Sequence, residues 1–61
     1  MLLTVQTELE DDGRWIAEVI ELPGVLAYGA TQDEAVCAAE ALALGVIADR
    51  IEHGEVAPGM P

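Results

Sequence analysis

Hydrophobic and polar residues alternate over the first ten positions of the chain. A period of two places successive side chains on opposite faces of a β-strand, so that one face is apolar and the other polar. We therefore expect a strand over residues 2–10. Its two faces are formed by Leu3, Val5, Thr7 and Leu9 on one side and by Thr4, Gln6, Glu8 and Glu10 on the other.

The loop Asp11-Asp12-Gly13 separates this strand from a second one, expected over residues 14–20. If Gly13 takes the left-handed position of a G1 bulge in a three-residue loop, Leu9 pairs with Trp15. A two-residue turn is the alternative, and it pairs Leu9 with Ile16. We favour the first register, which also sets Thr7 beside Ala17 and Val5 beside Val19. The opposite face then holds Ile16 and Ile20, or Trp15 and Val19 in the second register, and is less polar than a solvated sheet face should be.

A turn at Pro23-Gly24 ends the hairpin. Proline presets φ for the first central position of a type II turn, and glycine accepts the positive φ of the second. The apolar run that follows, bounded by Gly24 and Gly29, suits a third, half-buried strand over residues 25–28.

The pattern changes to helical spacing at Thr31. Thr31 and Glu34 form a capping box, in which the threonine hydroxyl accepts from the Glu34 N–H and the Glu34 carboxylate accepts from the Thr31 N–H. Gly54 is the expected C′ residue, and His53 places positive charge near the negative end of the helix dipole. The helix is therefore expected over residues 32–53.

This helix is apolar nearly all round, which is typical of a buried helix. Its expected core face is Ala35, Ala39, Leu42 and Val46, flanked by Ala38 and Ala43. A second stripe on the opposite side is Val36, Leu44, Ile47 and Ile51. One three-stranded sheet covers only one side of a helix, so we expect the second stripe to form the interface of a homodimer or a higher homo-oligomer. The alternative is that residues 55–61 cover it.

These elements predict an α+β fold, a three-stranded antiparallel sheet in the order β-β-β-α with one helix packed on one face. A short fourth strand is left open. The domain is expected over residues 1–54, and residues 55–61 should be a flexible tail. A chain of 61 residues buries only ~60% of the surface of its unfolded form, and this small core also favours oligomerisation.

The run from Gly13 to Ala35, GRWIAEVIELPGVLAYGATQDEA, resembles the amino-terminal domain of HicB-like antitoxins, a partial RNase H fold. The order and spacing of the motifs carry the resemblance; the matching residues are Gly13, Trp15, Ala17, Glu21, Leu22, Pro23, Gly24, Gly29, Thr31, Glu34 and Ala35. There are two departures: Ile20 stands where the family often has proline, and the sequence does not include the DNA-binding extension of many members. The resemblance implies a partner, a HicA-type toxin, which is a small basic protein that cleaves mRNA.

The net charge of the chain bears on which classes of partner it can bind. Twelve acidic residues stand against two arginines and no lysine, which gives a formal net charge of -10. A protein gains affinity for nucleic acid by neutralising several phosphates with Lys and Arg, so we expect no direct binding of DNA or RNA. The acidity has two interpretations: it keeps a small hydrophobic protein soluble, or it complements a basic partner.

Candidate chemistry is sparse. One cysteine cannot close an intrachain disulfide and there is no Cys/His cluster, so we expect a cytoplasmic protein without a metal or cofactor. No apolar run reaches the ~20 residues of a membrane span, so no membrane association is expected. Cys37 has acidic neighbours that disfavour a thiolate, and we expect it to be buried and inert. His53 has no second histidine to complete a metal site.

Two functions from different classes follow. The first is a non-enzymatic, antitoxin-like protein that binds and neutralises a basic HicA-type toxin through Glu21, Leu22 and Tyr28, an apolar anchor beside carboxylates. The alternative for Leu22 and Tyr28 is that they belong to the core. The second function is a self-associating structural or small-ligand-binding module with no toxin partner. A minimal metal-dependent nuclease is a third interpretation, although no position here matches the acidic cluster of RNase H enzymes.

Overall fold

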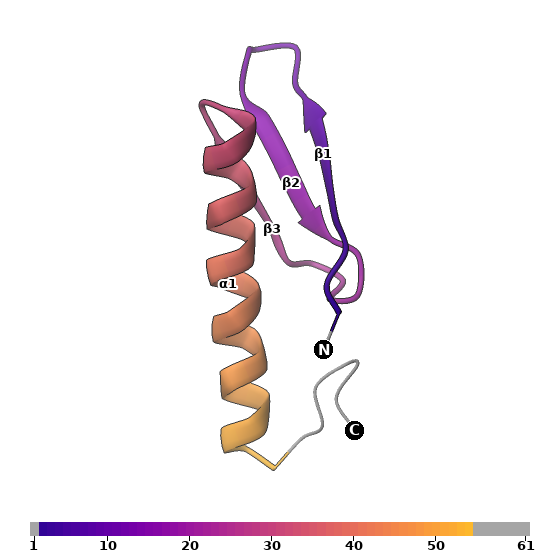
Figure 1. The fold of residues 1–61 in the computed structure, drawn as a ribbon, viewed down its shortest axis with the longest axis vertical. Helices are drawn as coiled ribbons and strands as arrows, with labels where there is room; N and C mark the ends of the chain where they lie inside the picture. The colour runs from indigo at the N-terminus through magenta and orange to yellow at the C-terminus, as the bar shows by residue number, and fades with distance from the viewer. Residues whose placement is uncertain (1, 55–61) are drawn as a thin grey trace.

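The computed structural model describes residues 2–54, and the predicted tail over residues 55–61 lies outside them. Within this range three strands, β1 (Val5–Leu9), β2 (Trp15–Val19) and β3 (Leu26–Gly29), precede one helix, α1 (Gln32–Glu52). β2 is central and pairs antiparallel with both neighbours, and α1 lies along one face of the sheet (Figure 1). The predicted α+β fold is confirmed, with three strands in the described part of the chain.

The β1–β2 hairpin has the three-residue loop and the favoured register. Gly13 has a φ of 90° and donates its N–H to the Glu10 carbonyl at 3.0 Å, while the Glu10 N–H donates to the Arg14 carbonyl at 2.7 Å. These bonds form the G1 bulge that sets the pairing. The residues on the helix side are therefore paired as predicted: Val5 with Val19, Thr7 with Ala17, and Leu9 with Trp15.

The turn between β2 and β3 is the predicted type II turn. Gly24 has a φ of 89°, and the Val25 N–H donates to the Leu22 carbonyl at 3.0 Å across Pro23-Gly24. β3 begins at Leu26 and ends at Gly29, one residue later than predicted at each end. Val25 precedes it, with its N–H in the turn and its carbonyl accepting from the Val19 N–H at 3.0 Å.

The amino-terminal cap of α1 differs from the prediction in one bond. The Thr31 hydroxyl accepts from the Glu34 N–H at 3.1 Å, as expected. The Glu34 carboxylate, however, accepts from the N–H of Ala30 at 3.1 Å rather than from that of Thr31. The bond therefore holds the residue that leaves β3 against the first turn of the helix. At the other end Gly54 has a φ of 78° and donates to the Ile51 carbonyl at 3.0 Å, which ends α1 as predicted.

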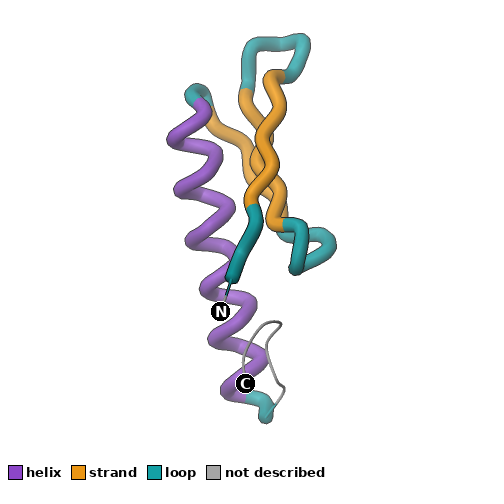
Figure 2. Tube along the Cα trace, turned by 45° about the vertical axis from the view of Figure 1, so that its right-hand side comes forward, coloured by secondary structure: helices purple, strands orange, loops and turns teal. Residues whose placement is uncertain are grey.

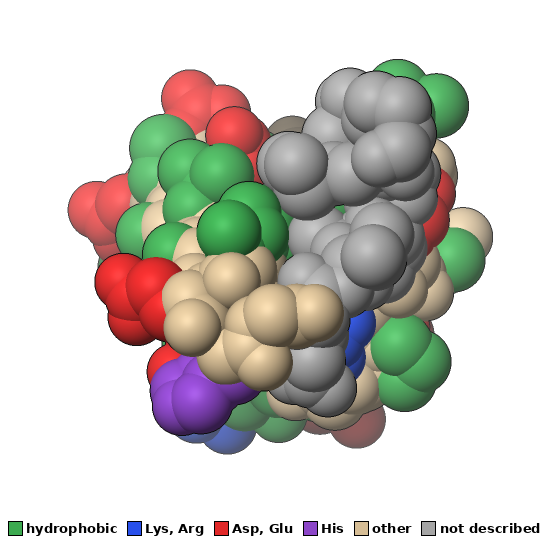
Figure 3. Space-filling view, turned by 90° about the horizontal axis from the view of Figure 1, so that it is seen from below, with side chains coloured by type: hydrophobic (Ala, Val, Ile, Leu, Met, Phe, Trp, Pro, Cys, Tyr) green, Lys and Arg blue, Asp and Glu red, His purple; other side chains and the backbone are tan. Residues whose placement is uncertain are grey.

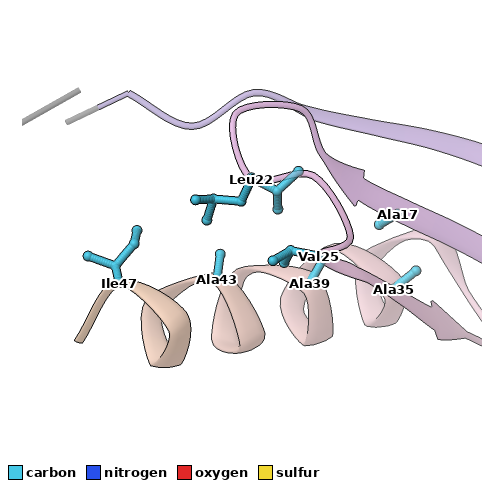
Figure 4. Packing of buried hydrophobic residues seen from close by; sticks show 8 residues of the cluster. Ala17, Leu22, Val25, Ala35, Ala39, Ala43 and Ile47 are labelled. Carbon is cyan, nitrogen blue, oxygen red and sulfur yellow. The ribbon is translucent and has the colours of Figure 1, made fainter. Parts of the chain in front are cut away.

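The core lies between α1, the inner face of the sheet and the β2–β3 turn (Figure 4). Its helix residues follow an i, i+4 row. The buried core residues within residues 2–54 are Ala17, Val19, Leu22, Val25, Ala35, Ala39, Ala43 and Ile47. This corrects the predicted helix face. The i, i+4 row is inclined to the helix axis, so by the third turn Leu42 has left the contact and is 45% exposed, and Ile47 has entered it and is 3% exposed.

Helix α1 is longer than the sheet. Its 21 residues span about 32 Å at 1.5 Å per residue, whereas the five-residue strands β1 and β2 span about 17 Å. The carboxyl-terminal part of α1 therefore extends past the strands, and in a second view the helix still lies to one side of them (Figure 2). No element within residues 2–54 covers the opposite face of the sheet.

Candidate functional site

The sheet face turned away from α1 is one of the surfaces within residues 2–54 that expose apolar side chains. We call it the outer sheet face, and the strand register assigns to it Gln6, Glu8, Ile16, Glu18, Leu26 and Tyr28. Leu26 is 38% exposed and Tyr28 is 45% exposed. A shallow hollow of about 160 Å³ lies on this face and is lined by Gln6, Thr7, Glu8, Ile16, Glu18 and Leu26.

Two carboxylates stand close together on the outer sheet face. Glu8 is opposite Ile16, and Glu18 is two residues further along β2, so the two glutamates are diagonal neighbours. Diagonal neighbours lie about 7–8 Å apart, which is close enough for like charges to repel. Neither carboxylate has a counter-ion in the described part of the chain, where the ion pairs join Arg14 to Asp12 and His53 to Asp49.

Arg14 is held at one end of this face. Its Nε lies 2.7 Å from Asp12 Oδ2, and its Cζ lies 4.4 Å from the centre of the Tyr28 ring, a cation–π contact. The Arg14 backbone N–H also donates to Asp12 Oδ1 at 3.0 Å, and this bond together with the guanidinium lowers the pKa of Asp12. The guanidinium is therefore occupied by Asp12 and Tyr28.

Glu21 has a structural bond at the opposite end of the sheet. Its Oε1 accepts from the backbone N–H of Thr4 at 2.6 Å, which ties the residues before β1 to those after β2. Hydrogen bonding by the side chain and the backbone N–H of Thr4 lowers the pKa of Glu21. Its charge is partly engaged within the chain, unlike the charges of Glu8 and Glu18.

The predicted partner-binding residues do not form one surface. Leu22 is completely buried in the core, which corrects its assignment to an exposed anchor and agrees with the alternative that it is a core residue. Tyr28 is exposed, but its partner on β2 is Ile16. Ile16 is four residues before Ile20, which is the residue next to Glu21. That separation is about 13 Å of strand, so Tyr28 lies well away from the turn that carries Glu21.

The outer sheet face can bind another molecule through apolar contact and charge together, because it combines exposed apolar side chains with uncompensated carboxylates. Comparisons of the chain with protein-family models, curated proteins and solved structures found no match. The function proposed below therefore rests on the residues of this chain and on the resemblance of residues 13–35.

The second apolar surface lies on α1, on the side away from the sheet. Leu44, Ala48 and Ile51 follow one another at i, i+4 and i+7, and we call them the helix row; Leu44 is 56% exposed and Ile51 is 50% exposed. Seen from the end where α1 terminates, hydrophobic side chains lie exposed between acidic ones (Figure 3). Leu42 lies on another flank, beside a groove lined by Ala41, Leu42, Gly45, Val46, Asp49 and Arg50.

The predicted oligomer interface is only partly exposed. Of its four residues, Leu44 and Ile51 are exposed as expected. Ile47 is a core residue, and Val36 is half-buried and packs against the core, so the assignment of these two to an outer stripe is corrected. The cause is the same rotation of the contact row that exposes Leu42.

Cys37 is exposed rather than buried, because it lies on the side of α1 opposite the Ala35–Ala39–Ala43 contact. The His53 Nδ1 lies 2.8 Å from the Asp49 carbonyl at the end of the helix. Residues 2–54 contain no group of three or more His, Cys, Asp or Glu placed to hold a metal ion. No helix among them is long and apolar enough to cross a membrane.

Sequence reasoning missed Glu8, Glu18 and Leu26 as candidate binding residues. The signal was available for the two glutamates, because the alternation over residues 2–10 and the favoured hairpin register together place them on the face that holds Ile16. Leu26 was harder to assign, since a four-residue strand gives too short a pattern to show which face each residue takes.

Proposed function

We propose that this chain is a non-enzymatic, antitoxin-like protein that binds and neutralises a small basic protein of the HicA type. The partner's identity comes from the resemblance of residues 13–35 to HicB-like antitoxins. The β-β-β-α order of the fold is the order that this resemblance implies. Binding, rather than catalysis, is the role assigned to the chain.

The observation that carries the proposal is the distribution of charge. Eleven of the twelve acidic residues, all but Glu55, lie within residues 2–54, and none of the eleven is buried. Among these eleven, and within residues 2–54, only Asp12 forms an ion pair with an arginine. A surface that holds RNA phosphates is positive, so an acidic protein is drawn to it with a fast, salt-sensitive association and can cover it.

The HicA-type partner is to be sought as a small basic protein encoded next to the gene for this chain, and co-expression of the two is expected to yield a complex. Its affinity should fall about tenfold or more between roughly 50 mM and 500 mM salt, because added ions screen the attraction. RNA cleavage by the partner should stop once the complex has formed, and the isolated chain should leave RNA intact. Absence of a complex at low salt, or cleavage of RNA by the isolated chain, would contradict the proposal.

The helix row favours a second candidate function, self-association. Burying the exposed half of Leu44 and Ile51 on two subunits contributes roughly 1 kcal/mol per side chain before the cost of association. The small Ala48 between them allows two helices to approach closely. We therefore expect a homodimer in which the helix rows of two copies pack together, with or without a toxin partner.

The variant Ile51→Glu tests this dimer. Sedimentation at concentrations up to about 1 mM is expected to show a monomer–dimer equilibrium for the unchanged chain. The variant should remain a monomer, since association would bury the new charge. The control is Leu26→Glu, which places the same charge on the outer sheet face and should leave the dimer intact. Ile47→Glu is unsuitable, because Ile47 belongs to the core. A monomer in the unchanged chain would contradict self-association.

A further inference from the structure

We propose that the outer sheet face is the surface that holds the partner, and that it binds a basic, amphipathic segment of that protein. Arginine or lysine side chains of the segment lie against Glu8 and Glu18, and its apolar side chains lie against Leu26 and Tyr28. This inference rests on the proposed function and assigns a surface to it.

The face has a polar edge on β1 and an apolar edge on β3, and the central strand β2 contributes one residue of each kind, Glu18 and Ile16. β1 contributes the polar Gln6 and Glu8 at one edge, and β3 contributes Leu26 and Tyr28 at the other. Each row across the three strands holds one carboxylate and at least one exposed or half-exposed apolar group: Gln6, Glu18 and Leu26 in one row, and Glu8, Ile16 and Tyr28 in the next. Adjacent strands lie about 4.8 Å apart, so a segment that binds here meets charge and apolar surface within one side-chain spacing.

Charge decides between the occupants of this face. A second copy stacked on it would bring the carboxylates of Glu8 and Glu18 against the same pair, and the Arg14 guanidinium of each copy already contacts Asp12 and Tyr28. Like charges brought together at an interface repel, so such a complex lacks the complementary charges that orient two partners. A basic segment instead supplies the counter-ions that the two glutamates lack within residues 2–54. Self-association and partner binding are thereby assigned to different surfaces, the helix row and the outer sheet face.

A peptide titration followed by NMR tests the surface directly. The probe is a short synthetic peptide of Arg-Arg-Leu-Leu repeats, which presents both residue types on each face of an extended chain. The controls are an arginine–serine peptide of equal charge and a glutamine–leucine peptide of equal apolar content. The arginine–leucine peptide is expected to shift the backbone amide signals of β1, β2 and β3 more than those of α1. It should bind at least about tenfold more tightly than either control, since each control lacks one of the two contributions.

Matched variants separate the surface from the net charge. Glu8→Gln combined with Glu18→Gln is expected to weaken the peptide about three- to tenfold, the range of two exposed ion pairs. Glu40→Gln combined with Glu52→Gln removes the same charge from α1, where neither glutamate has a hydrogen-bond partner, and should change affinity less than about twofold. Leu26→Ser should weaken binding about tenfold, and Leu42→Ser should not.

Equal weakening by the two double variants would overturn the inference, because net charge alone would then account for binding. Failure of the inference and failure of the proposed function are distinguishable with the adjacent gene product. If that protein binds the Glu8→Gln, Glu18→Gln and Leu26→Ser variants as tightly as the unchanged chain, the outer sheet face is not its binding surface. The antitoxin-like function then still stands. If it does not bind while the peptide binds at this face as expected, the surface stands and the antitoxin-like function fails.

Discussion

Replacing Gly29 by alanine is expected to unfold the chain or to leave it barely stable. A Cβ at this position would lie 2.5 Å from the Ala35 N and 2.9 Å from both the carbonyl carbon and the Cβ of Glu34. Two of these are backbone atoms of the first helical turn, so the helix itself must move. Overpacking usually costs about 1–3 kcal/mol, and contact with backbone places this variant at or above the upper end. A domain of this length is stable by only about 3–9 kcal/mol.

Urea unfolding followed by Trp15 fluorescence measures this loss, because Trp15 pairs with Gly29 across β2 and β3. The matched control is Gly45→Ala. Gly45 lies within α1, and a Cβ there meets nothing within 4 Å, so alanine should raise stability by about 0.5–1 kcal/mol through its higher helix propensity. Equal unfolding midpoints for the two variants would show that α1 does not pack against Gly29 as described.

Gly29 illustrates what the sequence could and could not predict. The resemblance to HicB-like antitoxins includes this glycine, and the neighbouring capping residue Thr31 marks the start of the helix correctly. Neither shows that the first turn of α1 touches the end of β3, since that contact joins two elements whose relative position no local pattern encodes. The same applies to the Glu34 carboxylate, which reaches Ala30 one residue beyond the expected position.

Local turn chemistry was the strongest predictor of the fold. Gly13 and Gly24 both have positive φ, as their turns require, and the Gly13 bulge set a register in which the inner and outer residues of β1 and β2 are all correct. The outer sheet face follows from that register. The rotation of α1 about its own axis could not be predicted from the sequence, because a helix that is apolar nearly all round offers several faces of similar hydrophobicity. Close approach of the sheet to three alanines, rather than a count of large residues, selected the face that is buried.

The Leu22→Ala variant is expected to show the second large effect, a loss of about 2–5 kcal/mol of stability, which is typical of a leucine removed from a core. Leu22 is completely buried, and it lies between the β2–β3 turn and the part of α1 that carries Ala43 and Ile47 (Figure 4). The turn on either side is held by backbone hydrogen bonds from Leu22 to Val19 and from Val25 to Leu22. The surrounding backbone therefore cannot collapse easily into the cavity, which favours the larger values.

Leu42→Ala is the matched control, because it makes the same chemical change on a side chain that is 45% exposed. Its effect should stay within about 0.5 kcal/mol, as for most surface substitutions. The pair tests the structure against the sequence pattern, which assigned Leu42 to the core and Leu22 to a partner-binding surface, with the core as the alternative for Leu22. A destabilised Leu42→Ala beside a stable Leu22→Ala would support the pattern and contradict the packing described here. The opposite result places Leu22 in the core and leaves recognition to side chains that reach solvent, with Leu26 and Tyr28 beside Glu8 and Glu18 on the outer sheet face.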